Sequence, residues 1–255
     1  MIKRLLIRKA KKVFVEEKDR IVSPEKIYFV EDITKDYHCS DGLFKRQDLK
    51  KKIGTIKSNT GKEFRIVEAS FIDSFKGIRK LAQTIPLKDM GFLIAESCID
   101  KKSIVLDVGT GSGASAIFLA RYAKKVYSYD INKDNLEHAI KNAIYFGAEN
   151  IVFEELDIYE KSPNNEFDFA LIDLTEPWRA LPNILRCMKL GSIIAVYCPQ
   201  ITQTQRLVNE ASGLGLLHMK TVEIIERDWK VEGLIVRPKS LSNIHSAFLT
   251  LLRIF

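Results

Sequence analysis

The chain has 255 residues, of which 46% are hydrophobic and 29% charged, with a mean hydropathy of −0.07. These values are typical of a soluble globular protein with one or two domains, and they exclude a disordered chain, a collagen-like chain and a disulfide-rich mini-protein. No stretch approaches the roughly 18 uncharged apolar residues that span a bilayer, and charges interrupt the N-terminal apolar run, so we expect a cytoplasmic protein. The four cysteines lack metal-ligand spacing, which predicts reduced thiols and no metal; only a Cys187–Cys198 bridge is left open.

The net charge of +7 is distributed unevenly along the chain. Residues 1–90 carry 22 Lys and Arg against 13 Asp and Glu, whereas residues 91–255 carry 18 against 20. A basic N-terminal third beside a nearly neutral remainder favours contact with a polyanion. On charge alone, the alternative is the solvated lysine-rich surface of a heat-adapted protein.

Short β-like runs separated by turn residues predict a small β-rich basic domain over residues 1–69. The runs are Val13–Val15, Lys26–Val30, Ile53–Ile56 and Phe64–Val67, with a hairpin turn at residues 59–61. Ser70 is typical of a helix N-cap, and apolar residues then recur at helical spacing as far as Leu81. We therefore expect residues 70–90 to contain a helix that connects this domain to the rest of the chain.

Strands and helices alternate after Pro86, which predicts an α/β domain over residues 91–255 with a mostly parallel sheet and helices on both faces. The expected strands are 103–107, 125–130, 151–156, 167–173 and 191–198, and the expected helices lie near 88–99, 113–123, 132–146, 177–188 and 202–213. Two further strand-like runs, 217–227 and 247–254, have no strong helix between them. They favour an antiparallel pair that closes the sheet.

The strongest local motif is Asp107-Val108-Gly109-Thr110-Gly111-Ser112-Gly113, in which a buried strand enters a helix through three glycines. Such glycines let the backbone approach a ligand closely. The turn also fits the dinucleotide pattern, and Asp130 at the end of the next strand suits the ribose hydroxyls of either kind of cofactor. Asp107 gives the Asp-x-Gly-x-Gly-x-Gly form of class I methyltransferases, which favours S-adenosylmethionine over a nicotinamide. A structural turn without ligand is the third interpretation.

Three further residues follow strand ends on the same edge of the predicted sheet. Ligands of open α/β sheets bind outside the carboxyl ends of the strands, so Asp173 is expected over the methyl group of the cofactor. Asp157, which ends the third strand, is expected near its adenine amino group. We also expect Ile131, next to Asp130, to contact the cofactor.

The stretch Asp173-Leu174-Thr175-Glu176-Pro177-Trp178 resembles the tRNA (adenine-N1)-methyltransferases that modify the T-loop, in their archaeal and bacterial homo-oligomeric form. Further segments fit this family in order along the chain: Pro199–Gln203, Glu226–Trp229, Arg237–Pro238 and His245–Leu249. The Tyr-Pro-Lys-Asp of the family stands here as Pro86-Leu87-Lys88-Asp89, without the tyrosine.

The resemblance implies a class I methyltransferase with a seven-stranded sheet, S-adenosylmethionine as cofactor, tRNA as partner and a homo-oligomer, a tetramer in relatives. It implies Asp173 as the catalytic residue, accepting a hydrogen bond from the amino group of the target adenine. The cofactor-binding positions would be Asp107, Gly109, Thr110, Gly111, Ser112, Gly113, Asp130, Ile131, Asp157 and Asp173. The positions expected to contact RNA are Lys50, Lys51, Lys52, Lys88, Trp178, Tyr197 and His245.

Other interpretations of the sequence stay open. One is an S-adenosylmethionine-dependent enzyme that acts on a small molecule or a protein, and another is a non-catalytic tRNA-binding subunit, which the intact glycine turn disfavours. A nicotinamide oxidoreductase lacks a recognisable proton donor beside the turn and leaves Asp173–Trp178 unexplained. His245 is also open, because it is equally suited to anchoring the last strand.

Overall fold

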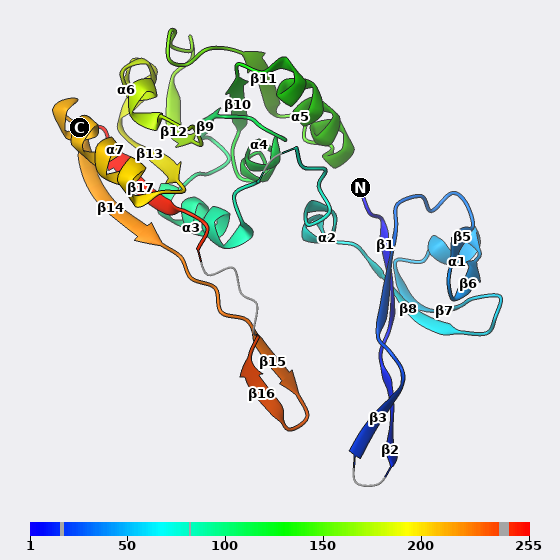
Figure 1. Cartoon of the computed structure of the whole chain (residues 1–255). Helices are drawn as coiled ribbons and strands as arrows, with labels where there is room; N and C mark the ends of the chain where they lie inside the picture. The colour runs from blue at the N-terminus through cyan, green and yellow to red at the C-terminus, as the bar shows by residue number, and fades with distance from the viewer. Residues whose placement is uncertain (16–17, 82, 240–244) are drawn as a thin grey trace. The chain divides into compact units, whose positions relative to one another are not determined.

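The computed structural model describes residues 1–15, 18–81, 83–239 and 245–255, without the side chains of residues 12–21. The chain forms two compact units, Met1–Ile78 and Arg79–Phe255. Figure 1 shows the first unit in blue to cyan and the second in cyan to red.

The first unit is built on a four-stranded antiparallel sheet in the order β4–β1–β8–β7. These strands are β4 (Lys26–Val30), β1 (Arg4–Arg8), β8 (Glu63–Glu68) and β7 (Ile53–Lys57). Two hairpins, β2 (Lys11–Val15) with β3 (Lys18–Ser23) and β5 (Tyr37–Cys39) with β6 (Gly42–Phe44), and the short helix α1 (Arg46–Leu49) complete the β-rich part.

One face of this sheet carries the core of the first unit. Leu6 of β1, Phe64 and Ile66 of β8 and Val30 of β4 are fully or almost fully buried there. Because side chains alternate along a strand, the face that carries Leu6 also carries the neighbouring cation Arg8. This inward-facing cation at the end of the strand pairs with the carboxylate of Asp41.

The helix expected from Ser70 to Leu81 is shorter in the structure. Helix α2 spans Phe71–Phe75, begins at the N-cap Ser70 with a capping box to Asp73, and ends before Gly77. Glycine is a poor helix residue, and here the Gly77 N–H bonds to the carbonyl of Ser74 in a tight turn. Residues 70–90 therefore contain α2 and the start of α3 (Leu87–Ser97) instead of one connecting helix.

The second unit has a seven-stranded sheet in the order β11–β10–β9–β12–β13–β17–β14, which confirms the expected class I methyltransferase fold. Its first five strands are parallel, and β17 pairs antiparallel with both β13 and β14, as expected for a closing pair. The strands are β9 (Ile104–Val108), β10 (Lys125–Asp130), β11 (Ile151–Glu155), β12 (Phe167–Ile172), β13 (Met188–Cys198), β14 (Leu217–Glu223) and β17 (Phe248–Arg253).

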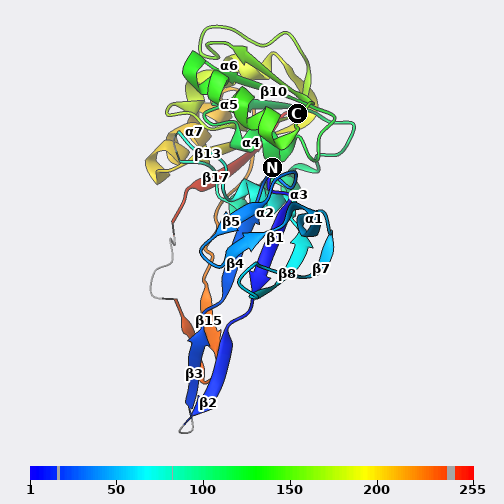
Figure 2. The same ribbon diagram turned by 90° about the vertical axis from the view of Figure 1, so that its right-hand side faces the viewer.

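Helices cover both faces of this sheet. Helix α4 (Ala114–Leu119) packs with α5 (Lys133–Phe146), and α6 (Pro177–Leu185) packs with α7 (Ile201–Gly213). Figure 2 shows α4 and α5 on one side of the sheet and α7 on the other. The central strands are almost continuously buried, as parallel strands covered on both faces are.

Between β14 and β17 lies a hairpin that the sequence analysis did not predict. It consists of β15 (Trp229–Glu232) and β16 (Ile235–Pro238), joined by a two-residue turn that includes Gly233.

The four cysteines are free, and Cys187 and Cys198 are buried, so the bridge left open between them is absent. In the described part of the chain, no helix combines the length and apolar character that crossing a membrane requires.

Candidate cofactor and active site

The turn after β9 uses its three glycines for different purposes. All three have positive φ, at 94° for Gly109, 50° for Gly111 and 75° for Gly113. A Cβ on Gly109 would lie 2.2 Å from the carbonyl oxygen of Asp173, and one on Gly113 would lie 2.8 Å from Cβ of Ala139. Nothing lies within 4 Å of the same point on Gly111. The outer glycines thus allow close packing, and the middle one faces open space.

A cavity of about 440 Å³ opens beside this turn. Its volume falls in the range of about 300–1,000 Å³ that is usual for small-molecule sites. Six of the expected cofactor positions line it: Gly109, Thr110, Gly111, Ser112, Asp130 and Asp173. The other lining residues, which sequence reasoning missed, are Gln83, Thr84, Ile85, Ala114, Ser115, Asn135, Tyr159, Leu174 and Thr175. The cavity therefore lies at the carboxyl ends of β9, β10 and β12, where ligands of such sheets bind.

Asp130 is held firmly at the wall of the cavity. Its Oδ2 accepts hydrogen bonds from the Gly111 N–H and the Asn135 side chain, both at 3.0 Å. Its Oδ1 accepts from the Asn132 N–H at 2.9 Å. A carboxylate has about four acceptor positions, so one remains for a ligand hydroxyl without breaking these bonds.

Asp107 lies behind the turn and is not among the described residues that line the cavity. It is 2% exposed and accepts a hydrogen bond of 2.6 Å from Ser128, whose hydroxyl lies 2.7 Å from that of Thr110. Burial, reinforced by the charges of Asp173 and Asp130, raises the pKa of Asp107 to about 7. The structure thus connects this carboxyl group to the cavity through Ser128 and Thr110.

Two expected cofactor positions lie close to the cavity without lining it. Asp157 accepts a hydrogen bond of 2.9 Å from the N–H of Tyr159, which does line the cavity. Ile131 follows Asp130 and is 65% exposed. The ligand contacts expected of both residues stay predictions.

Asp173 follows β12 and borders the cavity with its half-buried side chain. Its N–H bonds to the carbonyl of Val108 at 2.9 Å, which fixes it beside the glycine turn. Burial raises the pKa of its carboxyl group to about 6. At neutral pH the group is therefore mostly ionised but weakly solvated, which makes it a strong hydrogen-bond acceptor.

Lys88 belongs to a polar cluster inside the second unit. Its Nζ lies 2.6 Å from the carboxylate of Asp89, the carbonyl of Ile224 and the hydroxyl of Ser246. Ser246 in turn donates to Asp89, which is fully buried, at 2.6 Å. The N–H donors of Lys88 are all used within the chain, so a direct contact with RNA requires giving up one of these bonds. The linkage between Asp89 and Ser246 was not anticipated from the sequence.

Tyr197 and Trp178 each carry a buried polar atom that makes no hydrogen bond of standard geometry with the described residues. The hydroxyl of Tyr197, on β13, has its pKa raised to about 12 by burial and by the charges of Asp89 and Asp173. The indole of Trp178, at the start of α6, packs against the core with the Arg206 guanidinium 4.3 Å from its ring centre. Buried donors are rarely left unpaired, so both atoms are candidates for a ligand contact.

His245 uses both ring nitrogens inside the chain. Nδ1 lies 2.5 Å from the Glu223 carboxylate, and Nε2 lies 2.9 Å from the carbonyl of Pro199. Both partners are acceptors, so both nitrogens donate only when the ring is protonated, and the carboxylate raises the pKa of His245 accordingly. This arrangement ties the ends of β13 and β14 to the segment before β17, as anchoring requires.

The expected RNA contacts Lys50, Lys51 and Lys52 lie in the first unit, just after α1. The Lys51 ammonium pairs with Asp48 at 2.7 Å and that of Lys52 with Glu68 at 3.9 Å. Both pairs are exposed and therefore weak, and Glu68 is shared between Lys52 and Arg4. Their contact with RNA stays a prediction.

The fold, the glycine turn and the acidic residues around the cavity define a class I methyltransferase. Residues 78–247 match the model of a family described as "tRNA methyltransferase complex GCD14 subunit", and the chain belongs to this family. The methyl donor of this class of enzyme, S-adenosylmethionine, is the cofactor of the protein.

Two curated relatives cover most of the chain. The tRNA (adenine(57)-N(1)/adenine(58)-N(1))-methyltransferase TrmI of Methanocaldococcus jannaschii is 28% identical over 84% of this chain and 86% of its own length. The tRNA (adenine(58)-N(1))-methyltransferase TrmI of Thermus thermophilus is 27% identical over 78% of this chain and 80% of its own.

Solved structures agree on the fold. An S-adenosylmethionine-dependent O-methyltransferase from Thermotoga maritima superposes with a TM-score of 0.80 at 23% identity, covering 99% of this chain and 93% of its own. The tRNA (m1A58) methyltransferase TrmI of Aquifex aeolicus gives 0.76 at 22% identity, covering 99% and 97%.

Proposed function

We propose that the protein transfers a methyl group from S-adenosylmethionine to N1 of an adenosine in the T-loop region of tRNA. The observation that carries this proposal is Asp173, an acidic residue of raised pKa on the wall of the cavity beside an intact glycine turn. The surrounding Asp-Leu-Thr-Glu-Pro-Trp sequence and the likeness to the two TrmI enzymes favour tRNA over other methyl acceptors. A tRNA substrate also favours a cytoplasmic location.

The residues around the cavity fit S-adenosylmethionine. The open space at Gly111 leaves the backbone accessible to a ligand, and Asp130 keeps an acceptor position for a ribose hydroxyl. Ile131 offers apolar surface for an adenine ring, and Asp157 an acceptor for its amino group. When bound, the cofactor supplies an electrophilic methyl group. Asp107 supports the turn from behind through Ser128 and Thr110.

Asp173 supplies the chemistry that adenine N1 needs. This nitrogen is a poor nucleophile because its lone pair is weakly basic. A carboxylate that accepts a hydrogen bond from the exocyclic amino group pushes electron density toward N1 and stabilises the positive charge that forms there. The weak solvation of Asp173 strengthens both effects. Once N1 is aligned with the methyl group, the transfer proceeds directly and needs no covalent intermediate with the enzyme.

The target base must leave its stack before N1 is accessible, at a cost of a few kcal/mol. We assign Trp178 and Tyr197 to contact with this base. The buried indole N–H of Trp178 has no hydrogen-bond partner among the described residues, and the buried hydroxyl of Tyr197 interacts only with Ser246, outside ordinary hydrogen-bond geometry. In this protein Pro86 replaces the tyrosine of the family motif, which leaves more of this task to Tyr197. The cluster of Lys88, Asp89 and Ser246 lies beside Tyr197 and would hold it in position.

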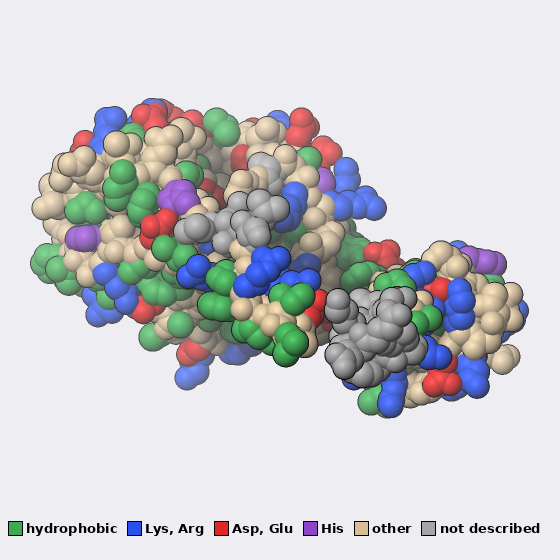
Figure 3. Space-filling view, turned by 60° about the horizontal axis from the view of Figure 1, so that its bottom comes forward, with side chains coloured by type: hydrophobic (Ala, Val, Ile, Leu, Met, Phe, Trp, Pro, Cys, Tyr) green, Lys and Arg blue, Asp and Glu red, His purple; other side chains and the backbone are tan. Residues whose placement is uncertain are grey.

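We also propose that the protein is a homo-oligomer, as its resemblance to tetrameric relatives implies. The hairpin β15–β16 supports this proposal with apolar side chains that are at least 47% exposed: Trp229, Val231, Leu234, Ile235 and Val236. Figure 3 shows hydrophobic and basic side chains together where this hairpin comes toward the viewer. Contiguous exposed apolar surface of this kind commonly marks a protein interface.

Transfer of labelled methyl groups distinguishes the proposed substrate class from its rivals. The protein is incubated with labelled S-adenosylmethionine and, separately, with bulk tRNA, a protein extract and a metabolite extract. We expect label in tRNA alone. Label in protein or metabolites but not in tRNA would contradict the proposal, and tRNA binding without cofactor affinity would indicate a non-catalytic subunit.

A further inference from the structure

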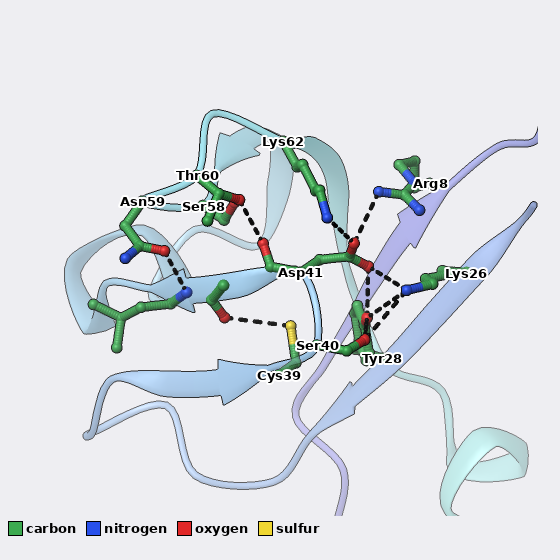
Figure 4. A network of polar contacts seen from close by, with 12 residues as sticks. Arg8, Lys26, Tyr28, Cys39, Ser40, Asp41, Ser58, Asn59, Thr60 and Lys62 are labelled. Atoms are coloured by element: carbon green, nitrogen blue, oxygen red, sulfur yellow. Dashed lines mark hydrogen bonds and ion pairs between the residues drawn. The ribbon is translucent and has the colours of Figure 1, made fainter. Parts of the chain in front are cut away.

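The first unit contains a buried carboxylate surrounded by cations. Asp41, in the turn between β5 and β6, is 2% exposed. Its Oδ1 contacts Lys62 at 2.7 Å and Arg8 at 3.2 Å, and its Oδ2 contacts the hydroxyl of Tyr28 at 2.6 Å and Lys26 at 2.9 Å. Figure 4 shows these four side chains converging on Asp41 from β1, β4 and the turn before β8.

This arrangement has an excess of positive charge. Four contacts fill the acceptor positions of one carboxylate, so Asp41 has none left to offer. The bonds to Lys62, Tyr28 and Lys26 hold the pKa of Asp41 far below its usual range, and Tyr28 stays neutral because burial raises its pKa. Three cations around one anion leave a local charge of about +2.

Two of the three cations, Arg8 and Lys62, retain donors for a further anion. The Lys26 ammonium contributes charge only, because it already bonds to Asp41 at 2.9 Å, Ser40 at 3.2 Å and Tyr28 at 3.4 Å. Among the described residues, the Lys62 ammonium has only Asp41 as a hydrogen-bond acceptor, and it is 46% exposed. The Arg8 guanidinium donates to Asp41 with one Nη, and its other Nη has no hydrogen-bond acceptor among the described residues. Lys9 and Lys11, just beyond Arg8, are exposed. The missing ligand is therefore an acceptor that carries negative charge.

Asp41 also fixes the geometry of the cluster. Arg8 and Lys26 lie directly opposite each other on β1 and β4, and the Arg8 guanidinium packs over the Phe64 ring at 5.2 Å. Long cationic side chains usually lose considerable rotamer entropy when they bind a phosphate. Here the carboxylate and the ring have already restricted them, which makes the cluster a preorganised anion site, in contrast to the exposed ion pairs of Lys51 and Lys52.

We propose that Arg8 and Lys62, held together by Asp41 and reinforced by the positive charge of Lys26, bind a phosphodiester of the RNA substrate. This assignment rests on the proposed function, and it gives the basic first unit a defined contact point for nucleic acid. Arginine and lysine are the usual donors to backbone phosphates, and such contacts fix the position of a nucleic acid without reading its sequence.

The salt dependence of tRNA binding by the full-length protein tests this site. In the variant Lys26→Gln/Lys62→Gln we expect affinity at low salt to fall about tenfold or more, and the slope of log affinity against log salt to become shallower by about 1, the value for one lost phosphate contact. The matched control is Lys35→Gln/Lys57→Gln, which removes the same charge from two exposed lysines of the same unit that pair one-to-one with Asp32 and Glu63. Circular dichroism and thermal unfolding verify that both variants fold.

Equal affinities and equal slopes for the two double variants would overturn the proposal, because only net charge would then matter. Lys62→Arg provides a second check: it keeps the charge and the donors, so affinity should stay within about twofold of wild type. Failure of the proposed function is a separate result, namely no methyl transfer to tRNA by the wild-type protein.

Discussion

Asp173 lies at the carboxyl end of β12 with a half-buried carboxyl group and a raised pKa. Replacing it by asparagine keeps the size and removes the negative charge. We expect Asp173→Asn to lower single-turnover methyl transfer to tRNA by about 10²–10³-fold, the usual cost of losing one electrostatic contact to a transition state. The affinity for S-adenosylmethionine, measured by calorimetry, should stay close to wild type.

The matched control is Asp168→Asn on the same strand. Asp168 bonds to the N–H of Ile104 and to Lys189, and it does not line the cavity. This variant should transfer methyl groups at a rate close to wild type. A full rate in Asp173→Asn, or an equal loss in both variants, would remove Asp173 from the mechanism.

The raised pKa of Asp173 predicts a pH dependence. Only the ionised carboxylate accepts a hydrogen bond from the amino group, so the rate at saturating cofactor should rise with pH through about 6 and level off above it. Saturation matters because Asp107, with a pKa of about 7, titrates near the same range. The residual rate of Asp173→Asn should lack the step near pH 6; a step that persists in this variant would assign the titration to another group.

Alanine at Gly109 should lower mainly the stability of the protein, and alanine at Gly111 mainly its affinity for the cofactor. Gly109→Ala would place a Cβ 2.2 Å from the Asp173 carbonyl at a φ of 94°, so we expect unfolding free energy to fall by about 2 kcal/mol or more. Gly111→Ala meets no protein atom and projects into open space, so it should weaken cofactor affinity with a smaller loss of stability. Chemical denaturation and calorimetry separate the two. Wild-type stability in Gly109→Ala would contradict the close approach seen here.

At the residue scale, the position of a side chain could be predicted from the sequence where it follows a strand end. The glycine turn, Asp130 and Asp173 reach the cavity because parallel strands all end at one edge of the sheet. Sequence spacing says nothing about which long side chains find internal partners, so the bonds of Lys88 to Asp89 and Ser246 were not foreseen, and its contact with RNA stays a prediction. Asn135 and Tyr159 were missed because their approach depends on how α5 and the loop after β11 fold back.

At the scale of elements, alternation of strands and helices located the strands of the second unit to within a few residues, apart from β13, which begins at Met188. The failures have local causes. Strand β1 was overlooked because Arg4 and Arg8 occupy its inward face, where apolar residues are expected. The hairpin β15–β16 was overlooked because its apolar residues are exposed instead of alternating with a buried face. Helix α2 ended early because Gly77 follows its last turn.

The hairpin β15–β16 carries the prediction for assembly. If its apolar residues bury against a second copy, replacing Val231 and Leu234 by threonine should lower the molar mass in solution toward the 29.1 kDa of one chain. Light scattering after gel filtration measures this mass. Leu190→Thr, also highly exposed but outside the hairpin, is the control. Unchanged mass in the hairpin variant would place the interface elsewhere.

Over the whole molecule, charge separates the two tasks. The net charge of +7 is the sum of strongly basic residues 1–90 and slightly acidic residues 91–255. Part of the excess positive charge of the first unit is concentrated around Asp41. Composition indicated a polyanion but not where it would bind. The lysine-rich stretch 50–52 was the expected contact, and in the structure two of these three lysines pair with acidic side chains. The two proposals therefore place phosphate contact in the first unit and methyl transfer in the second.

Mass-spectrometric mapping of a methylated tRNA transcript tests the central claim most directly. A transcript is incubated with the wild-type protein and S-adenosylmethionine, digested, and sequenced as fragments, with Asp173→Asn in parallel. We predict 1-methyladenosine in the T-loop fragment with the wild-type protein and almost none with the variant. Methylation of another nucleoside, of another position on adenine, or of a fragment outside the T-loop region would contradict the function proposed here.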